Sequence, residues 1–140
     1  MERLIYLSKA VEQFDELALA DLAEQAALMN AKCGVTGFLT HSEGTFLQCL
    51  EGEPAAVETI WQRVATDPRH AVTKVCRYRT SDARIFPDWH MRLLPAMPEH
   101  GDRYAILDRT FKAMCAPIAG DIHGLLEELL REIAATYLTP

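Results

Sequence analysis

The sequence predicts an α+β fold of the ferredoxin-like kind, in which two helices cover one face of an antiparallel sheet. Segments with the two-residue alternation of strands and segments with the apolar spacing of helices follow one another in the order β-α-β-β-α-β-β. The strand segments are apolar on both faces, so one helical layer would leave half of the sheet uncovered. Two more amphipathic helical segments follow near the C-terminus, and we expect these C-terminal helices to cover the other face.

The first elements are a strand, a helix and a β-hairpin. Leu19, Leu22 and Ala26 recur at the spacing of one helix face, and Gly34 follows as a stop. A Ser-Glu-Gly sequence then supplies a tight turn between two strand-like runs. The predicted bounds are 3–8 for the first strand, 17–32 for the helix, and 35–41 and 44–52 for the strands of the hairpin.

The following elements continue the pattern. Pro54 suits the first turn of a second helix, and Asp67-Pro68 ends that helix because a residue before proline avoids helical geometry. The linker-like stretch Pro95–Asp102 precedes the two C-terminal helices, the second of which has Asp121 as its predicted cap. The predicted bounds are 54–67 for the second helix, 72–80 and 89–94 for the last strands, and about 104–114 and 126–137 for the C-terminal helices.

The composition is that of a soluble domain with a hydrophobic core. The chain has 140 residues, 49% of them hydrophobic, and a net charge of −6, so it lacks the basic face that nucleic acids require. No apolar stretch approaches the roughly 20 residues that span a bilayer, and the N-terminus does not resemble a signal peptide. We therefore expect a cytoplasmic protein without nucleic-acid or membrane partners. Its cysteines, which should be reduced and which lack metal-ligand spacing, are Cys33, Cys49, Cys76 and Cys115.

Gln48 is the most informative polar residue. It lies in the predicted strand 44–52 and shares a face with Phe46 and Leu50. A buried amide is costly unless its donors and its acceptor find partners. From the residues alone two interpretations are open: Gln48 belongs to a satisfied core network, or it contacts a bound polar molecule.

Other polar residues on buried faces can converge with Gln48 between the two helices. Tyr6 lies on the inward face of the first strand, Asn30 ends the apolar stripe of the first helix, and Arg63 and Asp67 are four residues apart on the second. The amides of Asn30 and Gln48 and the Arg63/Asp67 pair suit the polar edge of a flat aromatic molecule with carbonyl and ring-nitrogen sites. The apolar side chains expected against its rings are Leu22, Leu39 and Val64.

Each of these residues also has an ordinary structural interpretation. Tyr6 would be a core tyrosine bonded to backbone, and Asn30 would bond to its own helical turn. Arg63 and Asp67 would form a surface ion pair that contributes less than about 1 kcal/mol. The histidines and cysteines show no metal motif and no activated nucleophile.

Five motifs in the first 96 residues resemble the BLUF domain, a family of blue-light receptors that hold a flavin. They are Leu4-Ile5-Tyr6-Leu7-Ser8, Asn30 before Gly34-Val35-Thr36-Gly37, Phe46-Leu47-Gln48-Cys49-Leu50-Glu51-Gly52, Asp67-Pro68-Arg69-His70 and Phe86-Pro87-Asp88-Trp89-His90-Met91. The resemblance implies a photosensor domain over residues 1–96. Residues 97–140 look like the C-terminal helical extension of the short, single-domain members, packed on the sheet.

The resemblance also implies roles for individual residues. Tyr6 would be the electron donor to the excited flavin, and Gln48 would be the switch amide bonded to Tyr6 and to the flavin N5/O4 edge. Asn30 would hold the flavin O4/N3 edge. Trp89 and Met91 match fifth-strand residues that change contacts near Gln48 when the signal is sent. The further cofactor contacts expected are Arg63, Asp67, His70, Met29, Leu22, Leu39 and Val64.

Two residues depart from the family pattern beside the flavin. Met29 stands where relatives often have Asn or His, and Ala26 stands where several relatives have Ser. Each removes one possible polar contact with the cofactor or the switch amide.

The leading hypothesis is a non-enzymatic blue-light photoreceptor that binds a flavin non-covalently, FAD before FMN or riboflavin. It would signal to a partner protein in trans through a light-driven Tyr/Gln/flavin hydrogen-bond rearrangement, and we expect a homo-oligomer. Two alternatives are a small ferredoxin-like acyl-phosphate hydrolase that uses Arg63 and Asn30, and a cofactor-free interaction module in which Gln48 is a core amide.

Overall fold

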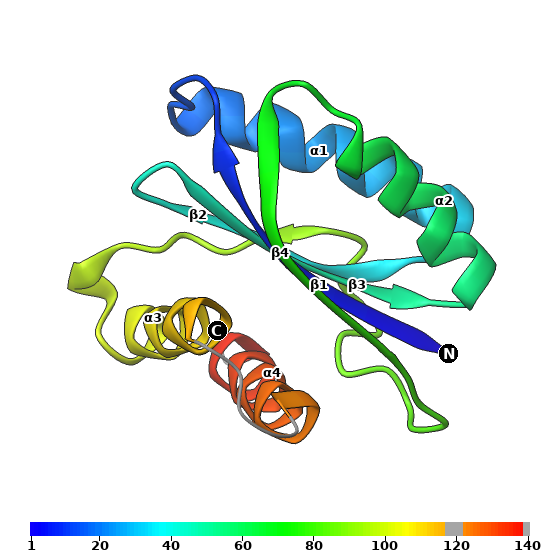
Figure 1. The fold of residues 1–140 in the computed structure, drawn as a ribbon. Helices are drawn as coiled ribbons and strands as arrows, with labels where there is room; N and C mark the ends of the chain where they lie inside the picture. The colour runs from blue at the N-terminus through cyan, green and yellow to red at the C-terminus, as the bar shows by residue number, and fades with distance from the viewer. Residues whose placement is uncertain (117–121, 139–140) are drawn as a thin grey trace. The chain divides into compact units, whose positions relative to one another are not determined.

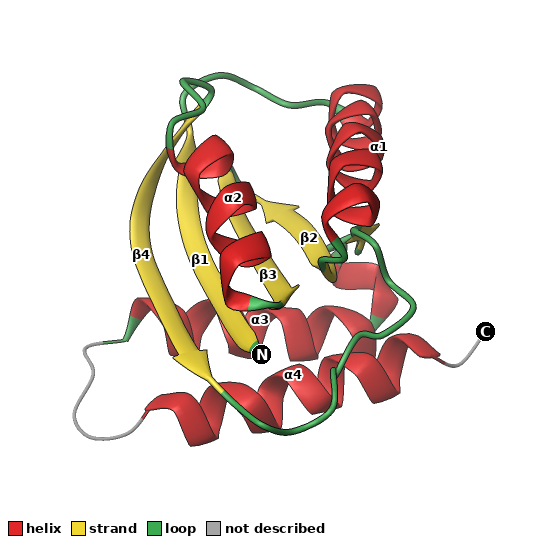
Figure 2. Ribbon diagram, turned by 90° about the vertical axis from the view of Figure 1, so that its right-hand side faces the viewer, coloured by secondary structure: helices red, strands yellow, loops and turns green. Residues whose placement is uncertain are grey.

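The chain divides into two compact units, residues Met1–Leu94 and Pro95–Pro140 (Figure 1). The computed structural model describes residues 1–116 and 122–138. The first unit is a five-stranded sheet with α1 and α2 on one face (Figure 2). Its elements are β1 (Glu2–Ala10), α1 (Glu16–Cys33), β2 (Thr36–Ser42), β3 (Thr45–Gly52), α2 (Pro54–Ala65), β4 (His70–Arg79) and β5 (Arg92–Leu93). The predicted α+β class and element order are confirmed.

The sheet has the strand order β4-β1-β3-β2-β5, so β1 and β3 lie at its centre. Tyr6 of β1 is directly opposite Gln48 of β3, and Gln48 is in turn opposite Leu39 of β2. Residues opposite each other on neighbouring strands point to the same face of a sheet. The register therefore places Tyr6, Gln48 and Leu39 in one row under the two helices.

The last strand is shorter than predicted and runs in a different direction. Only Arg92–Leu93 is a strand, and it pairs parallel with β2, so the sheet is mixed rather than antiparallel. The backbone N–H of Trp89 donates to the Phe86 carbonyl (3.4 Å), which turns the chain back on itself before β5. Trp89 and Met91 thus precede the strand in which they were expected.

The second unit contains the two predicted helices, α3 (Asp102–Cys115) and α4 (Ile122–Leu138), and a short 3₁₀ turn, Pro98–His100, that was not predicted. The buried side of α4 includes Leu126, Leu130 and Ile133. The predicted cap Asp121 lies outside the described residues. The predicted packing of this unit on the sheet stays a prediction. Within the part of the chain that the structure describes, no helix has both the length and the apolar character to cross a membrane.

The two ends of α1 are formed by local side-chain and backbone chemistry. Asp15 Oδ1 accepts a hydrogen bond from the Ala18 backbone N–H (2.8 Å), and Gly34 closes the helix in the left-handed conformation (φ 70°), as expected for the predicted stop. The α2 N-cap, Glu53, makes no such side-chain bond.

Asp15→Ala is expected to lower the free energy of unfolding by about 1 kcal/mol, because the Ala18 N–H loses its side-chain acceptor. Urea denaturation followed by circular dichroism measures the effect. Glu53→Ala is the matched control, and its loss should be smaller because only a charge near the helix end is removed. Equal losses for the two variants would contradict the capping role of Asp15.

Candidate functional site

A cleft between α1 and α2 opens above the central strands. It consists of two adjoining cavities, one with an empty volume of about 450 Å³ and a larger one that opens to solvent. The smaller cavity is lined mainly by apolar side chains, which is the usual form of a small-molecule site, and the larger cavity is lined by apolar and polar side chains alike. The residues that line both cavities are Leu22, Ala26, Gln48, Val64, Asp67 and Arg69.

Tyr6 and Gln48 form a hydrogen-bonded pair at the base of this cleft. Tyr6 Oη donates to Gln48 Oε1 at 2.5 Å, and the two residues are only 3% and 4% exposed. Burial, and then the nearby Asp67 carboxylate, raise the pKa of Tyr6 well above its usual range, so its hydroxyl stays protonated. The acceptor end of the Gln48 amide therefore has a defined donor.

The other end of Gln48 has a weaker partner. Its Nε2 donates to the Met91 sulfur at 3.2 Å, and a thioether is a poor acceptor. Trp89 stacks on Phe86 instead, with ring centroids 5.0 Å apart. Of the two residues expected near the amide, Met91 is thus the one in contact with it.

Asn30 brings an unpartnered donor to the cleft. The residue is 1% exposed and lines the larger cavity. Its backbone carbonyl accepts from the Val35 N–H (2.9 Å), but its side-chain Nδ2 is buried without a hydrogen-bond partner. A buried donor left unsatisfied costs about 1–3 kcal/mol. Its position thus indicates a site for an acceptor on a bound molecule.

The predicted pair between Arg63 and Asp67 is wrong. The Asp67 carboxylate instead binds Arg69, with Nη2–Oδ2 at 2.6 Å and Nε–Oδ1 at 3.0 Å, and these bonds lower the pKa of Asp67. Arg63 Nη1 lies 3.5 Å from the Met29 sulfur. Because α2 ends at Ala65, Asp67 lies beyond the helix and is not a neighbour of Arg63 on its surface. All three side chains, Arg63, Asp67 and Met29, still line the larger cavity.

The remaining predicted contacts lie around the smaller cavity. His70 Nε2 donates to the Val64 carbonyl (2.6 Å), and its Nδ1 faces Ser8 Oγ at the same distance. The His70 ring lies 5.8 Å from the Tyr6 ring, centroid to centroid. Besides Tyr6, Gln48 and Asp67, the predicted residues that line this cavity are Leu22, Leu39, Val64 and His70.

Several lining residues were not predicted as site residues: Phe14, Gln25, Phe46, Ile60, Pro68 and Arg69. Arg69 lines both cavities, and it could have been predicted from the Asp-Pro-Arg turn that follows the end of α2. Phe14 lines the smaller cavity and packs edge-on against Phe46. An apolar residue immediately before a helix cap commonly packs on the first turn, so Phe14 could have been expected from its place before Asp15.

Comparisons with known proteins agree with this geometry. Residues 1–92 match the family model BLUF, described as sensors of blue light using FAD. The photoactivated adenylate cyclase subunit beta of Euglena longa is 35% identical over 94 residues, which are 66% of this chain and 11% of that protein. The chain therefore spans about a tenth of the length of this curated relative.

Solved structures match over nearly the whole chain. The photo-activated state of BlsA has a TM-score of 0.74 at 26% identity and covers 95% of this chain and 94% of its own. The dark state of the BLUF protein BlrB has a TM-score of 0.70 at 26% identity, with 96% of both chains covered. The chain belongs to the BLUF family of flavin-dependent blue-light sensors.

Proposed function

We propose that this chain senses blue light through a flavin held non-covalently in the cleft between α1 and α2. The observation that carries the proposal is the buried Tyr6–Gln48 hydrogen bond at the base of that cleft. The oxidisable phenol of Tyr6 and the Gln48 amide, whose donor and acceptor ends can be exchanged, are hydrogen-bonded there and line the cavity. FAD is the proposed flavin, and FMN or riboflavin would use the same ring contacts.

The residues present fit a flavin ring. The unpartnered Asn30 Nδ2 can donate to a ring carbonyl, and Arg69 and Asp67 offer further polar contacts at the cleft. Leu22 and Val64 supply apolar walls that suit an aromatic ring system. When bound, the flavin supplies the blue-light absorption and the electron acceptor of the photochemistry.

The chain's own part in the response centres on one proton and one amide. The Tyr6 Oη proton already lies on the hydrogen bond to Gln48 Oε1. A glutamine amide has an acceptor at one end and a donor at the other, so reversing it by rotation or tautomerisation exchanges what each neighbour meets. After reversal, Tyr6 would no longer face the Oε1 acceptor of Gln48, and Met91 would no longer face its Nε2 donor. We therefore propose that Met91 transmits the change at Gln48 to the rest of the protein.

We further propose that the chain acts without catalysis, in the cytoplasm, on a separate partner protein. The matched relative carries the corresponding stretch as about a tenth of a chain named as an adenylate cyclase subunit, which supports a sensor role for this part. The free thiols, among them the exposed Cys115, suit a reducing compartment. Leu125 on α4 is 49% exposed and is a candidate contact for a homo-oligomer.

The experiment that tests the proposal is the absorption spectrum of the purified protein before and after blue light. Flavin bands that shift reversibly to the red are expected. A protein that takes up no flavin after reconstitution would refute the proposal. A colourless protein that hydrolyses acyl phosphates would favour the hydrolase, and one without cofactor or turnover would favour a plain interaction module.

Asn30→Ala is expected to weaken flavin affinity about 5- to 100-fold, because one buried hydrogen bond to the ligand is lost. Fluorescence titration of the apoprotein with FAD measures the dissociation constant. Gln62→Ala removes an exposed amide from α2 and is the matched control. Unchanged affinity in the Asn30 variant would remove this residue from the site.

A further inference from the structure

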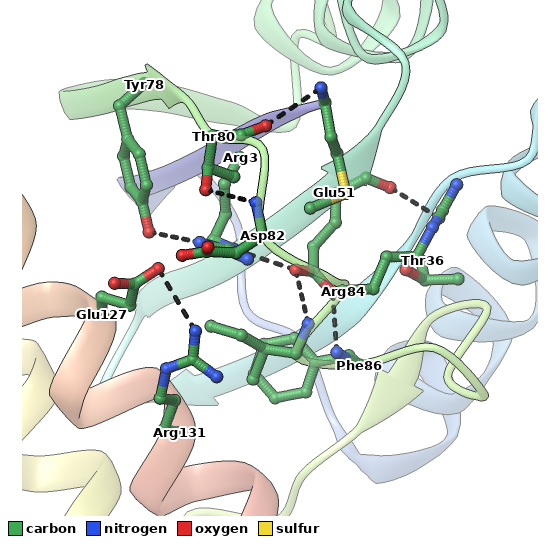
Figure 3. A network of polar contacts seen from close by, with 12 residues as sticks. Arg3, Thr36, Glu51, Tyr78, Thr80, Asp82, Arg84, Phe86, Glu127 and Arg131 are labelled. Atoms are coloured by element: carbon green, nitrogen blue, oxygen red, sulfur yellow. Dashed lines mark hydrogen bonds and ion pairs between the residues drawn. The ribbon is translucent and has the colours of Figure 1, made fainter.

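Glu51 of β3 places a fully buried carboxylate close to the switch residue but on the other face of the sheet. It lies three residues after Gln48, so alternation points the two side chains to opposite faces. Glu51 is 0% exposed. Its Oε1 accepts from the Phe86 backbone N–H (2.7 Å), and its Oε2 accepts from the Ile85 N–H (2.9 Å) and from Arg3 Nε (2.9 Å) (Figure 3).

The two N–H groups that Glu51 holds begin the stretch that carries Trp89 and Met91. We call residues 84–94 the exit segment, and only Arg92–Leu93 within it is a strand. Its first end is fixed by Glu51 and by Arg84, whose Nη2 donates to the Gly34 carbonyl (2.7 Å). At its other end, the Leu94 N–H donates to the Leu39 carbonyl (2.9 Å).

Between these fixed ends the exit segment touches the switch. The Met91 sulfur accepts from Gln48 Nε2, and Trp89 stacks on Phe86, whose N–H is bound to Glu51. A displacement of Met91 therefore takes place between anchored points, and the Trp89 carbonyl between them accepts from the Gly37 N–H (2.7 Å). One anchor, Phe86, is held by the same strand that carries Gln48.

We propose that Glu51 is a positioning residue that fixes the start of the exit segment, so that a change at Gln48 is confined to the residues around Trp89 and Met91. The proposal rests on the proposed switch role of Gln48. A carboxylate suits this task because both of its oxygens accept, whereas an amide offers one acceptor and one donor. Arg3 balances the buried charge and is itself bonded to the Tyr78 hydroxyl (2.7 Å).

The test is amide hydrogen exchange in the flavin-loaded protein in the dark, compared between wild type and Glu51→Gln. The exchange of the Ile85 and Phe86 amides should accelerate roughly 10- to 100-fold, since each hydrogen bond to a charged acceptor is lost or weakened. Glu58→Gln makes the same chemical change at an exposed carboxylate and should leave both amides unchanged.

A merely structural role for Glu51 would give a different pattern. General destabilisation would accelerate the central β1–β3 amides, such as those of Leu4 and Leu50, as much as those of Ile85 and Phe86. The proposal requires acceleration confined to the exit segment. Equal acceleration in both regions, or none at Ile85 and Phe86, would overturn it.

Two further measurements keep the proposal testable whatever the behaviour of the variant. If Glu51→Gln does not fold, exchange in the wild type decides: the Ile85 and Phe86 amides must be as protected as the central ladder, and rapid exchange there overturns the proposal. Illumination of the wild type should alter exchange at Trp89 and Met91 but not at Ile85 and Phe86. Faster exchange at all four amides on illumination would contradict the anchoring role of Glu51. A failure of the proposed sensor function would be distinguishable, because the flavin would then show no red shift.

Discussion

Gln48→Leu is expected to abolish the light-driven red shift of the bound flavin while the flavin stays in the cleft. Leucine fills a similar apolar space, but it can neither accept from Tyr6 Oη nor donate to the Met91 sulfur. The apolar walls of the cleft and the Asn30 donor remain, so retention of the cofactor should change little. Difference spectra before and after blue light, at matched flavin occupancy, measure the effect.

The same loss is expected for Tyr6→Phe, which removes a single oxygen from the pair. The ring and its contact with Trp61, 5.3 Å between centroids, can be kept by phenylalanine. Gln62→Leu, an exposed amide-to-leucine change on α2, is the matched control and should retain a normal red shift. A normal red shift in both the Gln48 and the Tyr6 variants would contradict the roles proposed for this pair.

Strand alternation was sufficient to predict the buried faces on which Tyr6 and Gln48 lie, whereas the bond between them was implied by the resemblance to the BLUF family. Tyr6 and Gln48 each lie on the apolar inward side of a strand, and the β1–β3 pairing then sets them opposite one another. The buried position of Asn30 was predicted from the apolar stripe of α1, which ends before Gly34. In each case the face of the element was readable from its own residues.

The errors arose where the contact depends on where an element ends. Four-residue spacing predicts an Arg63–Asp67 pair only if the helix continues, but α2 ends at Ala65 and the turn brings Arg69 to the carboxylate. The short β5 has the same origin, since the turn between Phe86 and Trp89 depends on packing that spacing does not reveal.

The contacts of Glu51 were not predictable for a different reason. Its partners Arg3, Ile85 and Phe86 are 48, 34 and 35 residues away along the chain. A Glu-Gly pair at the end of a strand is typical of an exposed turn. Only the tertiary fold brings the two backbone N–H groups and the guanidinium onto one carboxylate.

Gly37→Ala is expected to be the most destabilising of the glycine-to-alanine substitutions in the first unit. Gly37 has φ 151°, and a Cβ built on it would lie 1.8 Å from the Cys49 carbonyl oxygen of the neighbouring strand. The obstacle is backbone rather than a flexible side chain, so β2 and β3 would have to separate. The Gly37 N–H also donates to the Trp89 carbonyl (2.7 Å), so the same shift would disturb the exit segment.

The expected loss for Gly37→Ala is about 3 kcal/mol or more in the free energy of unfolding, from backbone strain and overpacking combined. Urea denaturation measures it. Gly124→Ala is the matched control: a Cβ at this position in α4 meets nothing within 4 Å, so stability should stay the same or rise by roughly 0.5–1 kcal/mol. A Gly37 variant as stable as the wild type would show that β2 can move from β3 without cost. Such a result would also contradict the inference that only glycine fits at position 37, where β2 contacts both β3 and the Trp89 backbone.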